Sequence, residues 1–246
     1  MVRLIIILLS VIVAFAFTVN AFWLQLNGDS TIDIINRLPV LFAPSNYVFF
    51  LWIFLYSYLL IWLFKYLKFK KIYGVVTPYQ TILFVANIII QVFSIISWHN
   101  EFFIPTIILL GIQFIILFIL YRTYPLSKES ITMRIPIAIY LSWTFYLFIL
   151  SICYVVVHIQ WHGFGLSNAL WCVLAMTIGT AIILHFRYHY YDVASPIVFI
   201  WCYIGIAIEN GFNELLVATA ALFLSGVLVV GILFIRKAQQ NVTKSS

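Results

Sequence analysis

The stretch LIIILLSVIVAFAFTVNAFWL, residues Leu4–Leu24, carries no charged side chain and is long enough to cross a bilayer as one helix. A hydrocarbon core of about 30 Å needs about 20 mostly apolar residues per helix. Seven more stretches share this character, so we predict eight transmembrane helices. Their expected bounds are Leu4–Leu24, Tyr47–Leu67, Tyr79–Trp98, Ile104–Tyr121, Ile135–Val157, Ser167–His185, Ser195–Ile208 and Leu215–Ile235.

The composition supports the same conclusion, because 65% of the 246 residues are hydrophobic and only 8% are charged. A soluble fold would have to expose much of this apolar surface to water. We therefore predict an all-α fold, a polytopic membrane helical bundle that forms a single domain over residues 1–246. The eight spans and their connections leave no room for a separate soluble catalytic domain.

Two of the expected spans have features that weaken the assignment. The seventh is short and opens with Pro196. The first resembles a cleavable signal peptide, because Met1–Arg3 precede an apolar run and Val19–Ala21 could form a cleavage site. Its apolar run reaches Trp23 and is longer than the apolar region of a usual signal peptide, so we interpret it as a membrane-spanning helix.

Basic residues lie at the termini or after even-numbered spans. They are Arg3, Lys68, Lys70, Lys71, Arg122, Lys128, Arg134, Arg187, Arg236, Lys237 and Lys244. The other loops contain Arg37 and no lysine, so the positive-inside bias predicts that both termini are cytoplasmic. The net charge of +6 then reflects topology and attraction to membrane lipid, and we expect no nucleic-acid partner.

The longest external segment is Gln25–Asn46, which contains Gly28, Asp29, Asp33 and two prolines. This composition suits an ordered cap over the mouth of the bundle better than a bare connection. A ligand that enters from outside or from the outer leaflet would meet this segment first.

Polar residues of the third span are spaced so that they share one helical face. Asn87, Gln91, Ser94 and Trp98 lie four, three and four residues apart. Polar side chains avoid lipid, so this face is expected to look into the bundle. It could provide hydrogen bonds between helices or form the polar wall of a ligand cavity.

Aromatic residues form comparable faces on two other spans. Phe49, Trp52 and Tyr56 share a face of the second span, and Tyr140 and Trp143 lie together in the fifth. Such stripes are often packing or interfacial residues. Together with the polar face they could also enclose a flat apolar ligand.

The centres of the spans contain no acidic residue, histidine or lysine. This argues against a proton pump, a retinal Schiff-base protein and a membrane metalloprotease, which need such groups inside the membrane. Two histidine pairs have the spacing of helical metal ligands, but both lie at helix ends where solvated histidines are common. We expect no metal, no cofactor and no catalytic residue. The pairs are His158 with His162 and His185 with His189, and the cysteines Cys153, Cys172 and Cys202 are expected to pack as small apolar residues.

Several short motifs resemble the TspO/MBR family, which comprises translocator proteins and tryptophan-rich sensory proteins. The run APSNYVFFLWIFLY, residues 43–56, is similar to the signature that opens the family's second helix. Tyr140–Trp143 resembles an element of its fifth helix, and Asp192–Trp201 resembles a segment of its longer members. The chain departs from the family pattern at Ile53 and at Ser142, where small residues or glycine are usual.

The resemblance implies a five-helix unit over residues 1–157, with three helices appended over residues 158–246. It also implies a pocket beneath the first loop that takes tetrapyrrole or lipid-like ligands. The candidate ligand-binding residues carried over from the family are Pro44, Phe49, Trp52, Tyr56, Tyr140 and Trp143. The shared polar face adds Asn87 and Trp98.

These features favour a non-enzymatic receptor or regulator that binds a planar apolar ligand such as a porphyrin. We expect it in the cell membrane of a prokaryote. A transporter or permease for an apolar or amphipathic molecule is the alternative. An enzyme acting on a lipid, quinone or porphyrin would need a carboxylate, a histidine or a metal near the pocket. The outer side offers only His99, Glu101, His158, His162 and the more distant Asp29 and Asp33. The appended helices could form a homodimer contact or simply enlarge the packed surface.

Overall fold

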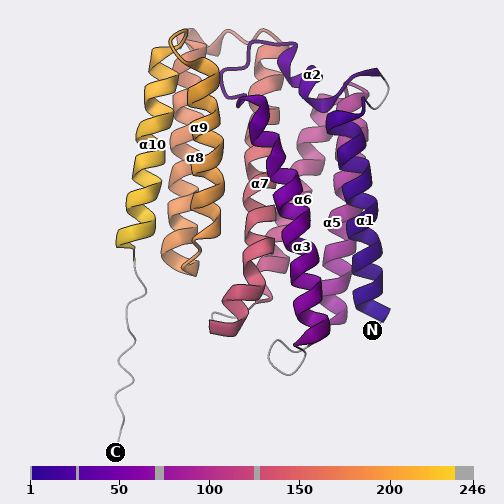
Figure 1. Ribbon diagram of the computed structural model, residues 1–246. Helices are drawn as coiled ribbons and strands as arrows, with labels where there is room; N and C mark the ends of the chain where they lie inside the picture. Colours follow the sequence, from indigo (N-terminus) through magenta and orange to yellow (C-terminus); the bar gives the residue numbers. More distant parts are fainter. Residues whose placement is uncertain (1, 26–27, 70–74, 125–127, 236–246) are drawn as a thin grey trace, which may run out of the picture.

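A computed structural model describes residues 2–25, 28–69, 75–124 and 128–235, with side chains from residue 133 in the last range. The described residues form helices and connections without a strand, so the predicted all-α fold is confirmed. The long helices stand side by side in one bundle (Figure 1). They are α1 (Val2–Trp23), α3 (Leu51–Lys68), α5 (Pro78–His99), α6 (Phe103–Arg122), α7 (Lys128–His158), α8 (Asn168–Tyr190), α9 (Ala194–Asn210) and α10 (Leu215–Phe234). Three shorter helices connect them: α2 (Thr31–Asn36), η2 (Asn46–Phe50) and η3 (Gly163–Gly165).

Among the described residues, seven segments are long and apolar enough to cross a membrane. The expected seventh span corresponds to α9, which is apolar but has only 17 residues. At 1.5 Å per residue it extends about 25 Å, slightly less than the hydrocarbon core. The chain is thus a polytopic helical bundle of seven candidate spans and one shorter apolar helix.

The outer surface of α6 shows how the bundle meets lipid. One face carries large exposed isoleucines spaced three or four residues apart. The opposite face buries Thr106, Leu110 and Gln113. Water would not tolerate this isoleucine stripe, whereas lipid chains do, so α6 has one face for lipid and one for the bundle. The stripe consists of Ile104, Ile108, Ile112, Ile115 and Ile119.

Local sequence determines where several helices begin. Thr77 and Gln80 form a reciprocal capping box at the start of α5, and Pro78 occupies the first helical turn. Ser30 and Asp33 form the same box at α2. The expected cap over Gln25–Asn46 therefore contains a defined helix.

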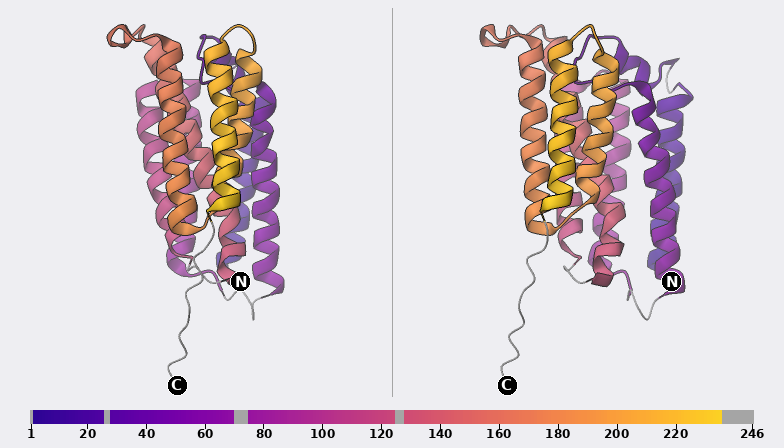
Figure 2. Two further views of the ribbon diagram at one scale, coloured as in Figure 1. Left: turned by 90° about the vertical axis from the view of Figure 1, so that its left-hand side faces the viewer. Right: turned by 60° about the vertical axis from the view of Figure 1, so that its left-hand side comes forward.

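The helices form two groups that meet at α7 and α9. Helices α1, α3, α5, α6 and α7 form one group, and α8, α9 and α10 pack together beside it (Figures 1 and 2). The hydroxyl of Ser142 in α7 donates to that of Ser195 in α9 at 2.6 Å. On another face, α9 lies so close to η2 that a Cβ on Gly205 would be 2.2 Å from Val48 Cγ2.

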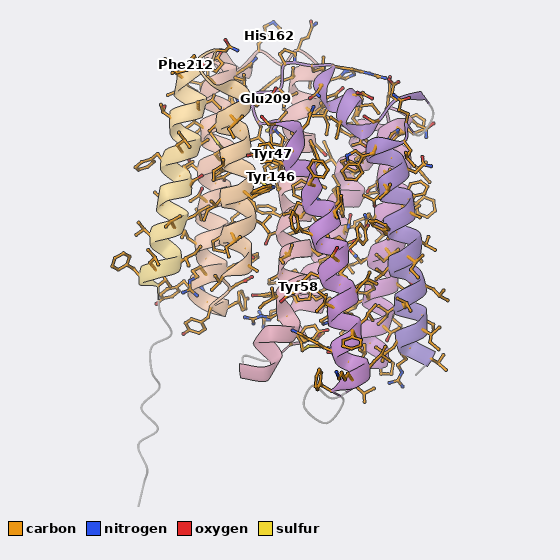
Figure 3. The ribbon with its side chains drawn as sticks, in the orientation of Figure 1. Tyr47, Tyr58, Tyr146, His162, Glu209 and Phe212 are labelled. Carbon is orange, nitrogen blue, oxygen red and sulfur yellow. The ribbon has the colours of Figure 1, made fainter. Side chains whose placement is uncertain are left out.

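Charges are divided between the two ends of the bundle. We call the end that holds α2, Asp29 and Glu101 the acidic end, and the opposite end, where α1 begins and α10 ends, the basic end (Figure 1). Figure 3 places His162, Glu209 and Phe212 at the acidic end and Tyr58 toward the basic end. The placement of the basic end in the cytoplasm stays a prediction. The described arginines of the basic end are Arg3, Arg122, Arg134 and Arg187, whereas Lys70, Lys71, Arg236, Lys237, Lys244 and the side chain of Lys128 lie outside the described residues.

Candidate functional site

An aromatic cluster fills the space between α3 and α7. Trp52 stacks on Tyr56 with ring centroids 5.7 Å apart, and meets Trp143 edge to face at 5.9 Å. Trp143 in turn meets Phe49 edge to face at 6.0 Å and stacks on Tyr146 at 5.6 Å. All five rings are buried. The two aromatic faces expected from the sequence thus lie against each other inside the bundle.

A buried polar network joins four helices beside this cluster. The Gln91 Nε2 of α5 donates to the Tyr56 hydroxyl of α3 at 2.8 Å and to Thr18 Oγ1 of α1 at 3.1 Å. The Thr18 and Tyr56 hydroxyls are hydrogen-bonded to each other at 2.9 Å. The Tyr140 hydroxyl of α7 donates to the side-chain amide oxygen Oε1 of Gln91. Gln91 therefore forms hydrogen bonds between helices, which is the first of the two interpretations of the polar face.

A cavity of about 60 Å³ lies between this network and α2. Residues at the acidic-end termini of α1, α5 and α7 contribute to its wall, and Thr31 and Ile35 of α2 lie over it. Ser94 and Trp98 of the polar face also line this cavity. That the cavity takes a ligand, as the second interpretation of this face expects, stays a prediction. The lining residues are Phe22, Thr31, Ile35, Trp52, Gln91, Ser94, Ile95, Trp98, Thr106, Leu110, Gln113, Thr144, Leu147, Leu150 and Ser151.

Several polar atoms around the cavity are buried without a hydrogen-bond partner in the described part of the chain. Four belong to lining residues: Trp52 Nε1, Trp98 Nε1, Gln113 Oε1 and Thr144 Oγ1. Asn87 in α5 has neither its amide nitrogen nor its oxygen paired. A buried polar group without a partner costs free energy, so the four lining atoms have unused capacity for hydrogen bonds inside the cavity, whereas Asn87 does not line it.

The cap over the cavity is held by α5, by α7 and by the connection between α5 and α6. Thr31 Oγ1 is within 2.9 Å of His99 Nε2, at the end of α5. The Tyr154 hydroxyl of α7 donates to the Ile34 carbonyl at 3.1 Å. Arg37, just after α2, bridges Asp29 and Glu101 at 2.6 Å each. Separate hydrogen bonds and ion pairs of Thr31, Ile34 and Arg37 thus hold the cap in place.

Two cap residues have shifted pKa values with clear causes. The backbone N–H and the hydroxyl of Ser30 lower the pKa of Asp33 below its ordinary value. The hydrogen bond to Glu101, assisted by Asp29, raises the pKa of Arg37. Both groups stay charged near neutral pH, so the charges that fix α2 persist there.

The structure places the eight predicted site residues in three settings. Trp52 and Trp98 line the cavity. Phe49, Tyr56, Tyr140 and Trp143 belong to the buried aromatic and polar groups next to it, and Asn87 is buried in α5. Pro44 packs near Gly205 of α9 and is absent from the cavity wall.

Sequence reasoning missed most of the wall contributed by α6 and α7. Thr106, Leu110 and Gln113 are four and three residues apart on the buried face of α6. Thr144, Leu147 and Leu150 line the cavity from α7, where the sequence indicated only Ser151 of this wall. The rule applied to the third span, that polar side chains face inward, would have identified Gln113 in the otherwise apolar centre of α6.

The histidine pairs lie away from the cavity. His158 packs against Phe103 and Tyr154 at the acidic end, and the His185 and His189 rings lie 4.0 Å apart at the basic end of α8. Within the described ranges no three histidine, cysteine or acidic residues are grouped so that they could hold a metal ion.

Comparison with known proteins gives one match. A family model described as TSPO-like protein matches residues 4–234. No match was found among curated proteins or among solved structures. The matched range begins two residues inside α1 and ends with α10, so the last three helices lie inside the family region.

Proposed function

The chain belongs to the TSPO-like protein family, and from this premise we propose that it is a non-enzymatic membrane receptor or regulator that binds a planar apolar ligand beneath α2. The membership agrees with the TspO/MBR resemblance of its motifs. Together with the apolar helices, it identifies an integral membrane protein. The ligand, the cell membrane of a prokaryote and the homodimer remain predictions.

One observation carries the proposal: the cavity combines aromatic walls with buried polar atoms that lack partners. The Trp52 and Trp98 indole N–H groups could donate to carboxylates or carbonyls on the edge of a flat ligand. The aromatic rings and aliphatic side chains could cover its faces. Ligand sites in proteins usually have this mixture of apolar lining and a few polar groups.

The cavity is too small for a porphyrin unless the protein opens. Sites for drug-sized molecules usually measure about 300 Å³ or more, whereas this cavity holds about 60 Å³. A porphyrin could enter only if α2 moves away from the bundle. The bonds of Arg37 and of Thr31 would then break during entry, and the structure would correspond to the closed form.

The cavity wall favours binding over catalysis. None of its lining residues is acidic, histidine or lysine, the side chains that usually serve as general acids or bases, so its serine and threonine hydroxyls have no such base beside them in the wall. His99 touches the cap through Thr31 rather than lining the cavity. We also prefer binding to transport, because Gln91 is committed to bonds that hold four helices together.

Titration of the purified protein with protoporphyrin IX tests the proposal. We expect saturable quenching of tryptophan fluorescence, and an affinity reduced about threefold to tenfold by Trp52→Phe or Gln113→Leu, the range expected for one lost hydrogen bond. Trp62→Phe is the matched control, because Trp62 is buried on the same helix and its Nε1 also lacks a partner, yet it does not line the cavity. Affinities of the variants are measured from the absorbance of bound porphyrin.

Absence of saturable binding would refute the proposal, as would equal effects of Trp52→Phe and Trp62→Phe. Uptake by sealed vesicles separates the alternative, since accumulation of porphyrin inside vesicles would favour a transporter.

A further inference from the structure

A second, larger hollow of about 470 Å³ lies between the two groups of helices. Its floor is α7, and α3 and α9 flank it on either side (Figure 1). Its wall is almost entirely apolar. The lining residues are Leu51, Phe54, Arg134, Ile135, Ala138, Ile139, Tyr191, Asp192, Val193, Ala194, Ile197, Val198 and Trp201. We call it the α3/α9 groove.

Contacts between η2 and α9 close the groove toward the acidic end. The Trp201 indole N–H of α9 donates to the Val48 carbonyl at 3.3 Å, and its ring meets Tyr47 edge to face at 5.1 Å. Nearer the basic end, Phe54 lies on the α3 rim of the groove and Ile197 on the α9 rim, and they are 65% and 55% exposed. Since these rims lie on apolar membrane-spanning surfaces, the groove opens sideways to lipid.

Arg134 and Asp192 line the groove at its basic end. Asp192 accepts hydrogen bonds from the Tyr121 and Ser195 hydroxyls and from the Ala194 backbone N–H. The Arg134 guanidinium lies over the Tyr121 ring at 4.6 Å and donates to the Tyr190 carbonyl at 2.5 Å. Asp192 is thus held by neutral donors, and Arg134 by a ring and a carbonyl.

Two more arginines reach the same turn. Arg122 donates to the Tyr190 hydroxyl at 2.8 Å, and Arg187 donates to the Tyr191 carbonyl at 3.2 Å. Three guanidinium groups therefore surround residues 190–192, which contribute one carboxylate. Arg134 and Asp192 line the groove and Arg122 and Arg187 do not, so the positive charge belongs to the surroundings of this end rather than to its wall.

We propose that the α3/α9 groove binds an anionic phospholipid, with an acyl chain along α7 and its phosphate at Arg134. Three observations support this occupant: the apolar wall opens to lipid, the hollow is as large as a small-molecule site, and arginines surround its charged end. Basic pockets between transmembrane helices at the cytoplasmic side are known to bind anionic headgroups. The groove is separate from the cavity beneath α2, so this proposal stands whether or not a porphyrin binds there.

Native mass spectrometry of the delipidated protein in detergent tests the proposal. Phosphatidylglycerol and phosphatidylcholine with identical acyl chains are added in turn. We expect one phosphatidylglycerol to bind more tightly than phosphatidylcholine. Arg134→Gln should weaken it at least about fivefold, as expected for removal of one basic residue near a headgroup. Arg3→Gln is the matched control, because Arg3 also donates to a carbonyl at the basic end, on α1 away from the groove.

A second pair of variants tests the apolar part of the groove without altering the buried Arg134. Ile197→Trp places a bulky ring on the rim and should weaken both lipids. Ile208→Trp should change neither, because Ile208 is on the same helix and 60% exposed but does not line the groove. Equal binding of the two lipids by the unmodified protein would overturn the proposal. Equal effects of Ile197→Trp and Ile208→Trp would also overturn it.

Discussion

Replacement of Gln91 by methionine should destabilise the bundle by about 2 kcal/mol. Methionine has nearly the same length and shape as glutamine, so packing changes little while every hydrogen bond of the side chain is lost. Gln91 is 2% exposed and bonds to one residue each of α1, α3 and α7. The variant thus separates the energy of the bonds from that of the packing.

The magnitude follows from the three bonds in the network. Hydrogen bonds between membrane helices contribute about 0.6 kcal/mol each on average, which gives about 2 kcal/mol for three. Thr18 and Tyr56 keep their mutual bond at 2.9 Å, so they are not left without partners. Tyr140 loses the acceptor of its hydroxyl, which adds to the cost.

Asn87→Leu is the matched comparison on the same helix. Asn87 is fully buried and neither of its amide atoms has a partner among the described residues. Leucine has the same branched shape, so this change should be neutral or stabilising. Unfolding in mixed micelles with increasing SDS, followed by circular dichroism, measures both variants. If Gln91→Met costs no more than Asn87→Leu, the network does not hold the helices together.

Three further predictions concern packing and the cap. Gly205→Ala should cost about 1–3 kcal/mol because its Cβ would overlap Val48, whereas Gly226→Ala, with open space around it, should be neutral or slightly stabilising; thermal unfolding compares them. Arg37→Ala should speed porphyrin association in stopped-flow mixing by releasing α2, with less than about 1 kcal/mol change in stability because its ion pairs are exposed. The pKa of Asp33 is lower in the folded protein than its ordinary value of 3.8, so the Asp33 carboxylate stabilises α2 above pH 3.8 and this stabilisation is lost as the pH falls through the folded pKa. Amide hydrogen exchange in α2 should therefore accelerate at that low pH. Asp33→Asn should abolish this pH dependence.

The sequence predicted the membrane-spanning helices to within a few residues where apolar runs end in polar residues. The expected span Ile104–Tyr121 corresponds to α6, Phe103–Arg122, and Tyr79–Trp98 corresponds to α5, Pro78–His99. The start of α7 differs more, because the helix begins at Lys128 rather than Ile135. Hydropathy detects the part of a helix that lies in lipid, and a helix can continue into water beyond it.

The cavity was harder to predict because it depends on how the helices are rotated against each other. The spacing of Asn87, Gln91, Ser94 and Trp98 identified one inward face, yet only three of these residues line the cavity. Asn87 lies about one turn closer to the basic end of α5 than Gln91, outside the cavity wall. The position of Pro44 depends on α9, more than 150 residues away in sequence, through the close approach at Gly205. Local spacing contains no information about such distant contacts.

The structure suggests a role for α9 that the sequence alone did not indicate. Its Asn210 donates to the Leu41 carbonyl at 2.9 Å, and Glu209 accepts a hydrogen bond from the Ser45 hydroxyl at 2.8 Å. These bonds fix the second half of the cap, whereas α2 is held to α5 and α7 mainly through Thr31, Ile34 and Arg37. A lid that opens for a ligand would therefore move at α2 and stay anchored after residue 40. The same helix forms one wall of the α3/α9 groove, so both proposals depend on α9: it would anchor the lid and form part of the lipid site.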